Sequence, residues 1–135
     1  MRKLSMKALA AHGIWATSVI GVAALASLAG AGPAQADPVA PPVFARCAVC
    51  HNAAKGAEAK VGPNLWGIYG AKAGHAKFAY SPAFKAAATW KWTPEMLDKW
   101  ITGPMTVIPG TYMSFPGLKD PAKRADVIAY LKQLH

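Results

Sequence analysis

The sequence predicts a small all-α domain over residues 37–135, built of short helices joined by long loops. Three segments begin with a helix-start signal and continue with apolar residues at spacings of three and four. No segment alternates apolar and polar residues with the period of two that a half-buried strand shows. Turns rich in Gly and Pro fill the remainder. Loops this long in a small domain indicate a chain that wraps around a bound group.

The first helix is predicted to begin at Pro41-Pro42, because proline suits the first turn of a helix. Its apolar side then carries Val43, Phe44, Cys47, Ala48 and His51. A shorter helix is expected over residues 81–88.

Two further helices have stronger start signals. Thr93 is an N-cap followed by Pro94, and the helix is predicted to end at Gly103-Pro104. Its apolar stripe consists of Leu97, Trp100 and Ile101. Asp120-Pro121 opens the last helix in the same way, and its apolar face carries Val127, Tyr130, Leu131 and Leu134.

The first 36 residues have the layout of a secretory signal peptide. Basic residues precede an apolar, Ala-rich run at residues 8–29, and Ala34-Gln35-Ala36 forms a small-residue cleavage site. We therefore expect cleavage before Asp37, which leaves one periplasmic domain at residues 37–135 without a stable membrane insertion. An uncleaved membrane anchor is the alternative, since the apolar run approaches the ~20 residues that a span needs. His12 and the small-residue stop favour cleavage.

The charge of the exported part is positive. Three of the fifteen Lys and Arg residues precede Asp37, whereas all six Asp and Glu residues lie at or after it. Residues 37–135 therefore carry a net charge of +6. This surplus favours partners with acidic surfaces. Nucleic acid does not suit the chain as a partner, because the lysines are scattered and export removes the protein from the cytoplasm. We expect a monomer.

The two cysteines of the chain, Cys47 and Cys50, are followed directly by His51. On a helical turn the three side chains share one face. Two adjacent thiols can add to the two vinyl groups at one edge of a porphyrin, and the histidine can reach the iron from the same side. C-x-x-C-H is for this reason the attachment signature of haem c. The motif predicts one covalent haem with His51 as an iron ligand.

Other chemistries of a cysteine pair fit the sequence less well. A thioredoxin-like redox pair expects a βαβ context, which the predicted helices do not provide. A zinc site would need ligands from His75 or His135, and neither lies at finger-like spacing. An ordinary disulfide requires no histidine. A periplasmic thiol–disulfide oxidoreductase that uses Cys47 and Cys50 is the alternative function.

The second axial position of the iron decides between electron transfer and open-site chemistry. The other two histidines of residues 37–135 are His75 and His135. His75, in a Gly-flanked loop, is expected to be solvated or bonded to the loop, and the C-terminal His135 is expected to be exposed. Met96 lies beside the apolar stripe of its helix, where packing is the ordinary role of methionine. Met113 follows the turn Pro109-Gly110-Thr111 and is preferred, although spacing alone leaves Met105 open.

Six pieces of the sequence occur in the order found in one family: CAVCH, GPNLWGIYG, FAYS, the run from Trp92 to Leu97, IPGTYMSFPGL and RADVIAYL. From Phe44 to Leu134 the chain resembles class I cytochrome c, in particular the soluble bacterial cytochrome c2 branch and its mitochondrial relatives. The resemblance implies a small class I cytochrome c fold, in which helices and ordered loops wrap around one covalently bound haem.

The resemblance also implies roles for single residues. It implies that Met113 is the sixth iron ligand and that the Pro63 carbonyl accepts the ring proton of His51. The positions that hydrogen-bond the haem propionates correspond to Tyr80, Trp92 and Thr111. The aromatic beside the exposed haem edge corresponds to Phe115. The crossing of the first and last helices corresponds to Ala40, Phe44, Val127 and Tyr130.

Some positions depart from the family pattern. Trp100 stands where many relatives carry a tyrosine whose hydroxyl reaches the ligand sulfur, and an indole N–H has a different reach. Ala71 replaces an arginine that often neutralises a propionate, although Lys72 is adjacent. Docking lysines are replaced at Met105 and Tyr112. A basic edge is kept at Arg46, Lys60 and Lys119.

Together, the motif and the resemblance predict a periplasmic mono-haem protein that carries one electron at a time and catalyses no bond-making reaction. His/Met ligation and an apolar pocket would both raise its potential. That pocket is expected to contain Leu65, Trp92, Trp100 and Ile101. The expected partners are redox proteins with acidic docking surfaces: a membrane cytochrome complex, a terminal oxidase or a photosynthetic reaction centre.

Overall fold

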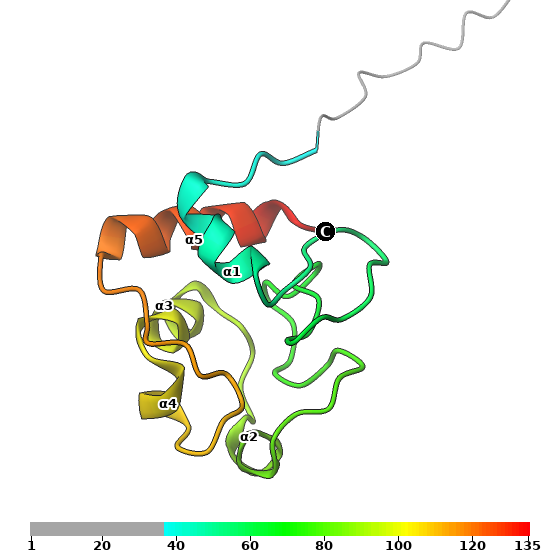
Figure 1. Cartoon of the computed structure of the whole chain (residues 1–135), viewed down its shortest axis with the longest axis vertical. Helices are drawn as coiled ribbons and strands as arrows, with labels where there is room; N and C mark the ends of the chain where they lie inside the picture. The colour runs from blue at the N-terminus through cyan, green and yellow to red at the C-terminus, as the bar shows by residue number, and fades with distance from the viewer. Residues whose placement is uncertain (1–36) are drawn as a thin grey trace, which may run out of the picture. The chain divides into compact units, whose positions relative to one another are not determined.

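A computed structural model describes residues 37–135, so the expected signal peptide at residues 1–36 lies outside the described part. In chain order the helices are η1 (Pro42–Phe44, a 3₁₀-helix), α1 (Ala45–Ala48), α2 (Pro82–Ala87), α3 (Pro94–Thr102), α4 (Pro104–Val107) and α5 (Pro121–Gln133), as Figure 1 shows. The β-pairing in this part is confined to an isolated bridge between Lys72 and Lys91. The all-α prediction is confirmed.

The first helix is shorter than the sequence predicts. It begins as the 3₁₀-helix η1 and continues as α1 only to Ala48, so His51 lies beyond its end. The turn nevertheless persists, because the amides of Cys50 and His51 both donate to the Cys47 carbonyl, at 3.0 and 2.9 Å. The three side chains of the motif therefore keep helix-like spacing without a full helix beneath them.

The Pro-led helices begin where the sequence places them. The Ser81 hydroxyl accepts from the Phe84 amide at the start of α2, and the Thr93 hydroxyl accepts from the Met96 amide at the start of α3. Asp120 caps α5 by accepting from the amides of the next turn. These caps satisfy amides that have no partner within the helix.

Helix α4 was not predicted. Gly103-Pro104 was interpreted only as the end of α3, and it does end that helix, with Gly103 as C-cap. Pro104 also stands at the first position of α4, where its fixed φ and missing N–H suit a new helix. The same dipeptide therefore closes one helix and opens the next.

The core lies where α5 packs against α3 and η1. The Phe44 and Tyr130 rings meet edge-to-face with centroids 4.7 Å apart, and Val127 of α5 is 1% exposed. Three of the four residues predicted at the crossing of the first and last helices, Phe44, Val127 and Tyr130, are therefore buried there. The fourth prediction, Ala40, is wrong, because this residue is exposed and precedes η1.

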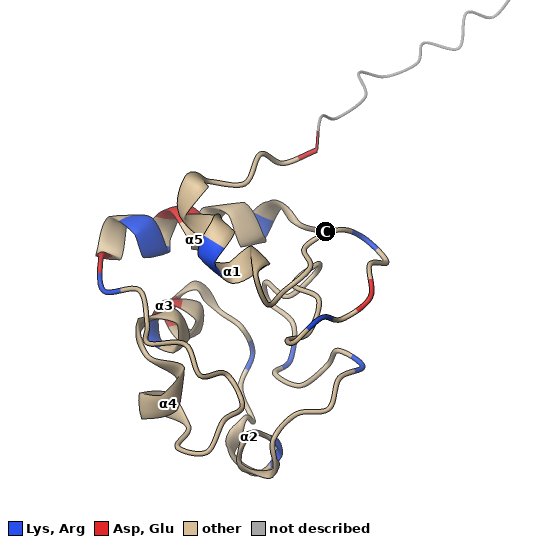
Figure 2. Ribbon diagram, viewed as in Figure 1, with Lys and Arg blue, Asp and Glu red and all other residues tan. Residues whose placement is uncertain are grey.

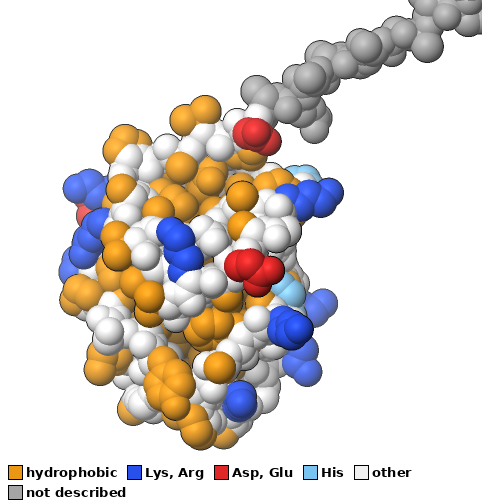
Figure 3. Space-filling view, turned by 45° about the vertical axis from the view of Figure 1, so that its right-hand side comes forward, with side chains coloured by type: hydrophobic (Ala, Val, Ile, Leu, Met, Phe, Trp, Pro, Cys, Tyr) orange, Lys and Arg blue, Asp and Glu red, His pale blue; other side chains and the backbone are white. Residues whose placement is uncertain are grey.

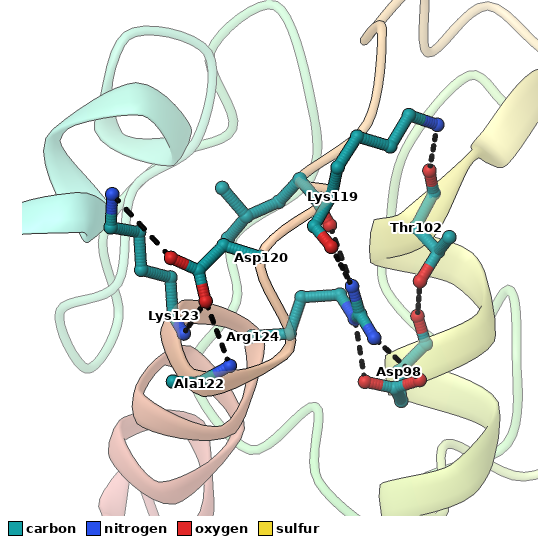
Figure 4. A network of polar contacts seen from close by, with 8 residues as sticks. Asp98, Thr102, Lys119, Asp120, Ala122, Lys123 and Arg124 are labelled. Carbon is teal, nitrogen blue, oxygen red and sulfur yellow. Dashed lines mark hydrogen bonds and ion pairs between the residues drawn. The ribbon is translucent and has the colours of Figure 1, made fainter.

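Arg124 joins α5 to α3 and to the segment before α5 (Figure 4). Its Nε donates to Asp98 Oδ1 at 2.7 Å. One terminal nitrogen also donates to the carbonyls of Leu118 and Lys119, at 3.0 and 2.9 Å. The Arg124 side chain is only 12% exposed, whereas its partner Asp98 is 46% exposed. The charged bonds of Arg124 join three segments of the chain.

The segment at residues 103–117 forms a loop that is closed at its base. The Leu118 amide donates to the Ile101 carbonyl at 2.9 Å, and Lys119 Nζ donates to the Thr102 carbonyl at 2.8 Å. These bonds join the end of α3 to the chain that leaves the loop. We call residues 103–117 the closed loop. No helix within residues 37–135 is long and apolar enough to cross a membrane.

Candidate cofactor site

One cavity brings together every residue for which the sequence predicted a site role. Its lining includes Cys47, Cys50, His51, Pro63, Tyr80, Trp92, Thr111 and Met113. The expected apolar pocket is also there, since the lining includes Leu65, Trp100 and Ile101. No Asp or Glu is among the residues that line this cavity. The walls are thus apolar apart from a few polar groups and the sulfur and imidazole groups.

The cysteine pair forms one edge of the cavity. Cys47 and Cys50 are free, half-buried thiols, and no disulfide joins them. Burial raises the pKa of Cys47, partly offset by the positive charge of Arg46. A raised pKa keeps the thiol protonated at neutral pH, which is the opposite of the low-pKa thiolate that reactive cysteines use.

The imidazole of His51 is fixed by its neighbours. Its Nδ1 lies 2.7 Å from the Pro63 carbonyl, so Nδ1 carries the proton and Nε2 is left with a free lone pair. Gly62 packs so closely on the ring that a Cβ there would overlap His51 Cε1. Burial lowers the pKa of His51, which favours the neutral imidazole that binds metals. The ring is therefore oriented and protonated as an iron ligand requires.

The closed loop brings Met113 to the cavity. Pro109 and Gly110 form a tight turn in which the Thr111 amide donates to the Ile108 carbonyl at 3.1 Å. Gly110 is the third of the four turn residues, and its φ of 86° is a left-handed value that favours glycine. The indole N–H of Trp100 donates to the Met113 sulfur over 3.1 Å. The position of the thioether is thus held from α3.

Aromatic side chains form one wall of the cavity, and Phe84 of α2 is one of them. Tyr80 stacks on Phe84 with centroids 4.8 Å apart, and Trp92 meets Trp100 edge-to-face at 5.6 Å. Burial raises the pKa of Tyr80, which keeps its hydroxyl a hydrogen-bond donor. Trp90 packs behind this wall, and its buried indole N–H has no hydrogen-bond partner.

The other candidate ligands lie elsewhere. Met105 of α4 is 54% exposed and does not line the cavity, and Met96 packs half-buried against the core. His75 and His135 are exposed, as expected. Within residues 37–135 no group of three or more His, Cys, Asp or Glu side chains is placed to hold a metal ion, so the structure gives no support to a zinc site.

Two basic residues near the motif, Arg46 and Lys60, make contacts within the chain itself. The Arg46 guanidinium lies over the Phe115 ring, 5.1 Å from its centroid. Lys60 Nζ donates to the Ala48 carbonyl at 2.8 Å. Figure 2 shows basic residues on α1, on α5 and along the loops rather than in one run.

The donor set fits a covalently held haem. The cavity supplies two adjacent thiols, a neutral imidazole with a free Nε2 and a thioether, within apolar walls. Thiolate clusters and carboxylates, which would suit zinc or hard cations, do not line it. In cytochromes c, His and Met are the iron ligands and a pair of cysteines attaches the haem.

The comparisons give the same class of protein. The sequence model of the Cytochrome c family matches residues 41–135, and the chain belongs to this family. It is 42% identical to cytochrome c2 of Blastochloris viridis over 87% of this chain and 92% of that one. It is 47% identical to cytochrome c of Ginkgo biloba over 65% of this chain and 78% of that one.

Solved structures agree with this assignment. Cytochrome cH from Methylobacterium extorquens is similar with a TM-score of 0.61 and 43% identity, over 67% of this chain and 90% of that one. Cytochrome c2 from Rhodospirillum centenum is similar with a TM-score of 0.63 and 34% identity, over 68% of this chain and 92% of that one. The chain is a class I cytochrome c that binds haem c through Cys47 and Cys50, and this class consists of electron carriers.

Sequence reasoning missed three contacts of this site. The only sequence signal for the close approach of Gly62 to His51 is a glycine directly before Pro63, since glycine allows another group to approach the backbone closely. The bonds from Lys60 to Ala48 and from Lys119 to Thr102 join segments far apart in sequence, and no local pattern signals them.

Proposed function

We propose that the protein is a periplasmic, mono-haem electron carrier with His51 and Met113 as its two axial ligands. The observation that carries the proposal is the pair of orienting hydrogen bonds in one cavity. Pro63 holds the His51 ring, and Trp100 holds the Met113 sulfur. Two filled axial positions leave no open site for substrate, so we expect no bond-making activity.

The bound haem supplies a one-electron iron couple to this site. The residues of the chain set its properties. Met113 as ligand and apolar walls such as Leu65 and Ile101 disfavour the extra positive charge of the ferric state, which raises the potential. We further propose that Tyr80, Trp92 and Thr111 donate to the propionates.

Location and partners follow from the sequence features already described. The signal-like start at residues 1–36 supports export to the periplasm, with the domain at residues 37–135 diffusing as a monomer. The net charge of +6 supports redox partners with acidic groups, such as a membrane cytochrome complex, a terminal oxidase or a reaction centre.

The comparisons give no support to the alternative function, a thiol–disulfide oxidoreductase. The raised pKa of the half-buried Cys47 also counts against it, since such an enzyme needs a thiolate.

The test is to express the full chain with the haem-attachment machinery and to purify it from the periplasm. A pyridine haemochrome spectrum and the mass of the protein are then measured, followed by a reductive titration. We expect one covalent haem and a reversible one-electron couple. Covalent haem whose reduced form binds carbon monoxide at neutral pH would contradict the filled axial positions. The Cys47→Ala/Cys50→Ala variant is the control for attachment.

A further inference from the structure

We propose that three tryptophan rings, those of Trp90, Trp92 and Trp100, carry single electrons from the cofactor site to oxidants that reach the protein at Trp90. We call these three residues the tryptophan relay. The inference rests on the proposed electron-carrier function, because the reduced iron supplies the electron. It adds a second activity, the repair of one-electron oxidation at a place outside the cavity.

The three indole rings form a continuous series of contacts that begins at the cavity. Trp100 Nε1 lies 3.1 Å from the Met113 sulfur. The ring centroids of Trp100 and Trp92 are 5.6 Å apart, and those of Trp92 and Trp90 are 5.8 Å apart. Trp90 also meets Trp100 directly, at 6.4 Å. These separations are those of aromatic rings in contact, so an electron crosses from one indole to the next over a short gap.

Backbone hydrogen bonds hold Trp90 and Trp92 on the same side of the chain. The Trp90 carbonyl accepts from the Ala73 amide at 2.9 Å. The Trp92 amide donates to the Ala71 carbonyl at 2.8 Å. Side chains two residues apart in an extended segment face the same way, so both indoles reach one aromatic cluster, whereas Lys91 between them is exposed.

The surroundings of the relay favour electron transfer without proton transfer. An oxidised indole is a strong acid and loses its N–H proton when a base lies beside it. The buried Trp90 N–H has no hydrogen-bond partner within residues 37–135, and the Trp100 N–H meets only a thioether, which is a weak acceptor. Each oxidised ring therefore keeps its proton, and the returning electron restores the neutral indole in one step.

The relay meets solvent at Trp90. This residue is half-buried and does not line the cavity, whereas the other two rings of the relay are buried. Lys91 beside it is exposed, and the bridge places Lys72, which is also exposed, directly opposite. Residues 59–94 contain five lysines and no Asp or Glu, so an anionic oxidant is attracted to this part of the surface. Figure 3 shows Lys and Arg side chains reaching solvent at several places along the margins of one face.

The electron balance of the repair is simple. The oxidant takes one electron from the Trp90 indole and becomes a closed-shell anion. Trp100 refills Trp90 directly or through Trp92, and the ferrous iron refills Trp100. The net change is the transfer of one electron from iron to oxidant, with no bond made in the protein and no proton moved. The direction is downhill, because an oxidised indole is a far stronger oxidant than a ferric His/Met haem.

The test uses the haem-loaded protein in its ferrous state, with the reductant removed. Pulse radiolysis of a bromide solution generates the dibromide radical anion, which oxidises tryptophan in preference to most other side chains and becomes bromide. The absorbances of the indole radical and of the haem are followed at several protein concentrations. We expect the indole radical to decay and the haem to be oxidised with one shared first-order rate constant, independent of concentration. Direct attack on the haem depends on concentration and is thereby separated.

Trp90→Phe is expected to lose this first-order step, because phenylalanine is not oxidised by the probe. Its midpoint potential and haem spectrum should match those of the parent protein, which shows that the fold is kept. Trp66→Phe is the matched control and should retain the step, since Trp66 is also half-buried but its ring contacts none of the relay rings.

A comparison without any substitution uses the ferric protein, which has no electron to supply. Its indole radical should outlive that of the ferrous protein. Peptide mass spectrometry should then find more oxidised Trp90, relative to oxidised Trp66, in the ferric than in the ferrous protein.

The proposal is overturned if haem oxidation in the parent protein is wholly concentration-dependent, or if the first-order step survives in Trp90→Phe. Equal ratios of oxidised Trp90 to oxidised Trp66 in the ferric and ferrous proteins also overturn it. Failure of the proposed function is distinct, because it shows before the pulse as missing covalent haem or irreversible reduction.

Discussion

The indole N–H of Trp100 points to the sulfur of Met113, and the two atoms are 3.1 Å apart. This contact comes from α3 and reaches the closed loop, so a helix that lies in the core positions a group on a loop. Because a thioether is a weak acceptor, the bond acts on the electron density of the sulfur more than on the stability of the fold. The contact predicts an effect on the potential.

Replacing Trp100 by Phe should lower the midpoint potential by up to about 40 mV, since a hydrogen bond of ~1 kcal/mol corresponds to that shift in a one-electron couple. With Met113 as the proposed axial ligand, a sulfur without this N–H donor would donate more charge to the iron and stabilise the ferric state. Trp90→Phe is the control, because the buried Trp90 N–H has no partner. Equal shifts in both variants, measured by redox titration, would show that the hydrogen bond is not the cause.

Met113→Ala should lower the potential by on the order of 0.1–0.2 V within the ~0.8 V range that axial ligands set. It should also abolish the near-red iron–sulfur charge-transfer band. Met105→Ala should leave both unchanged, because Met105 is exposed on α4 and does not line the cavity. If Met105→Ala removes the band and Met113→Ala does not, the ligand assignment is wrong.

Gly62→Ala should destabilise the protein by roughly 1–3 kcal/mol, the usual cost of forcing atoms into a packed site. The added methyl overlaps the His51 ring, so the ring must rotate away from the Pro63 carbonyl. Urea denaturation measures the loss of stability, and NMR of the His51 ring protons reports the rotation. Gly103→Ala is the control, since a Cβ there meets only the Thr106 side chain at 3.2 Å or more. An unchanged ring in Gly62→Ala would argue against the packing constraint.

Arg124→Ala should lower the free energy of unfolding by about 2 kcal/mol, because Asp98 and the carbonyls of Leu118 and Lys119 lose a charged donor. Lys123→Ala should cost under about 0.5 kcal/mol, since its pair with Asp120 is exposed and 3.7 Å long. Urea titrations of the haem-loaded protein compare the two. Similar losses in both variants would mean that the Arg124 cluster contributes no more than a surface ion pair.

Sequence patterns predicted the Pro-led helices well, because their signals are local. Thr93-Pro94 and Asp120-Pro121 each place a cap and a rigid first residue side by side, and α3 and α5 begin there. The first segment was harder, because Pro41-Pro42 allowed a 3₁₀ start that no periodicity distinguishes from an α-helix. The prediction for Ala40 came from the family resemblance, and it is wrong because the first helix begins only at Pro42.

The sequence predicted a set of residues that the structure brings to one cavity, but it did not predict their geometry. The spacing in CAVCH fixes which side chains share a face, and the family resemblance added the distant Met113. The resemblance also marked Trp100 as a departure, but only the packing of α3 against the closed loop shows that its N–H reaches the sulfur. Contacts between segments far apart in sequence depend on the whole fold, so no local pattern contains them.

The base of the closed loop has a consequence for insertions and deletions. The bonds of Leu118 and Lys119 to the end of α3 fix where the loop starts and finishes, whatever lies between. The position of Met113 therefore depends on how many residues separate it from each end of the closed loop. Removing one residue between Gly103 and Met113 would leave α3 and α5 intact and still move the sulfur, so length is as much a part of this site as residue identity.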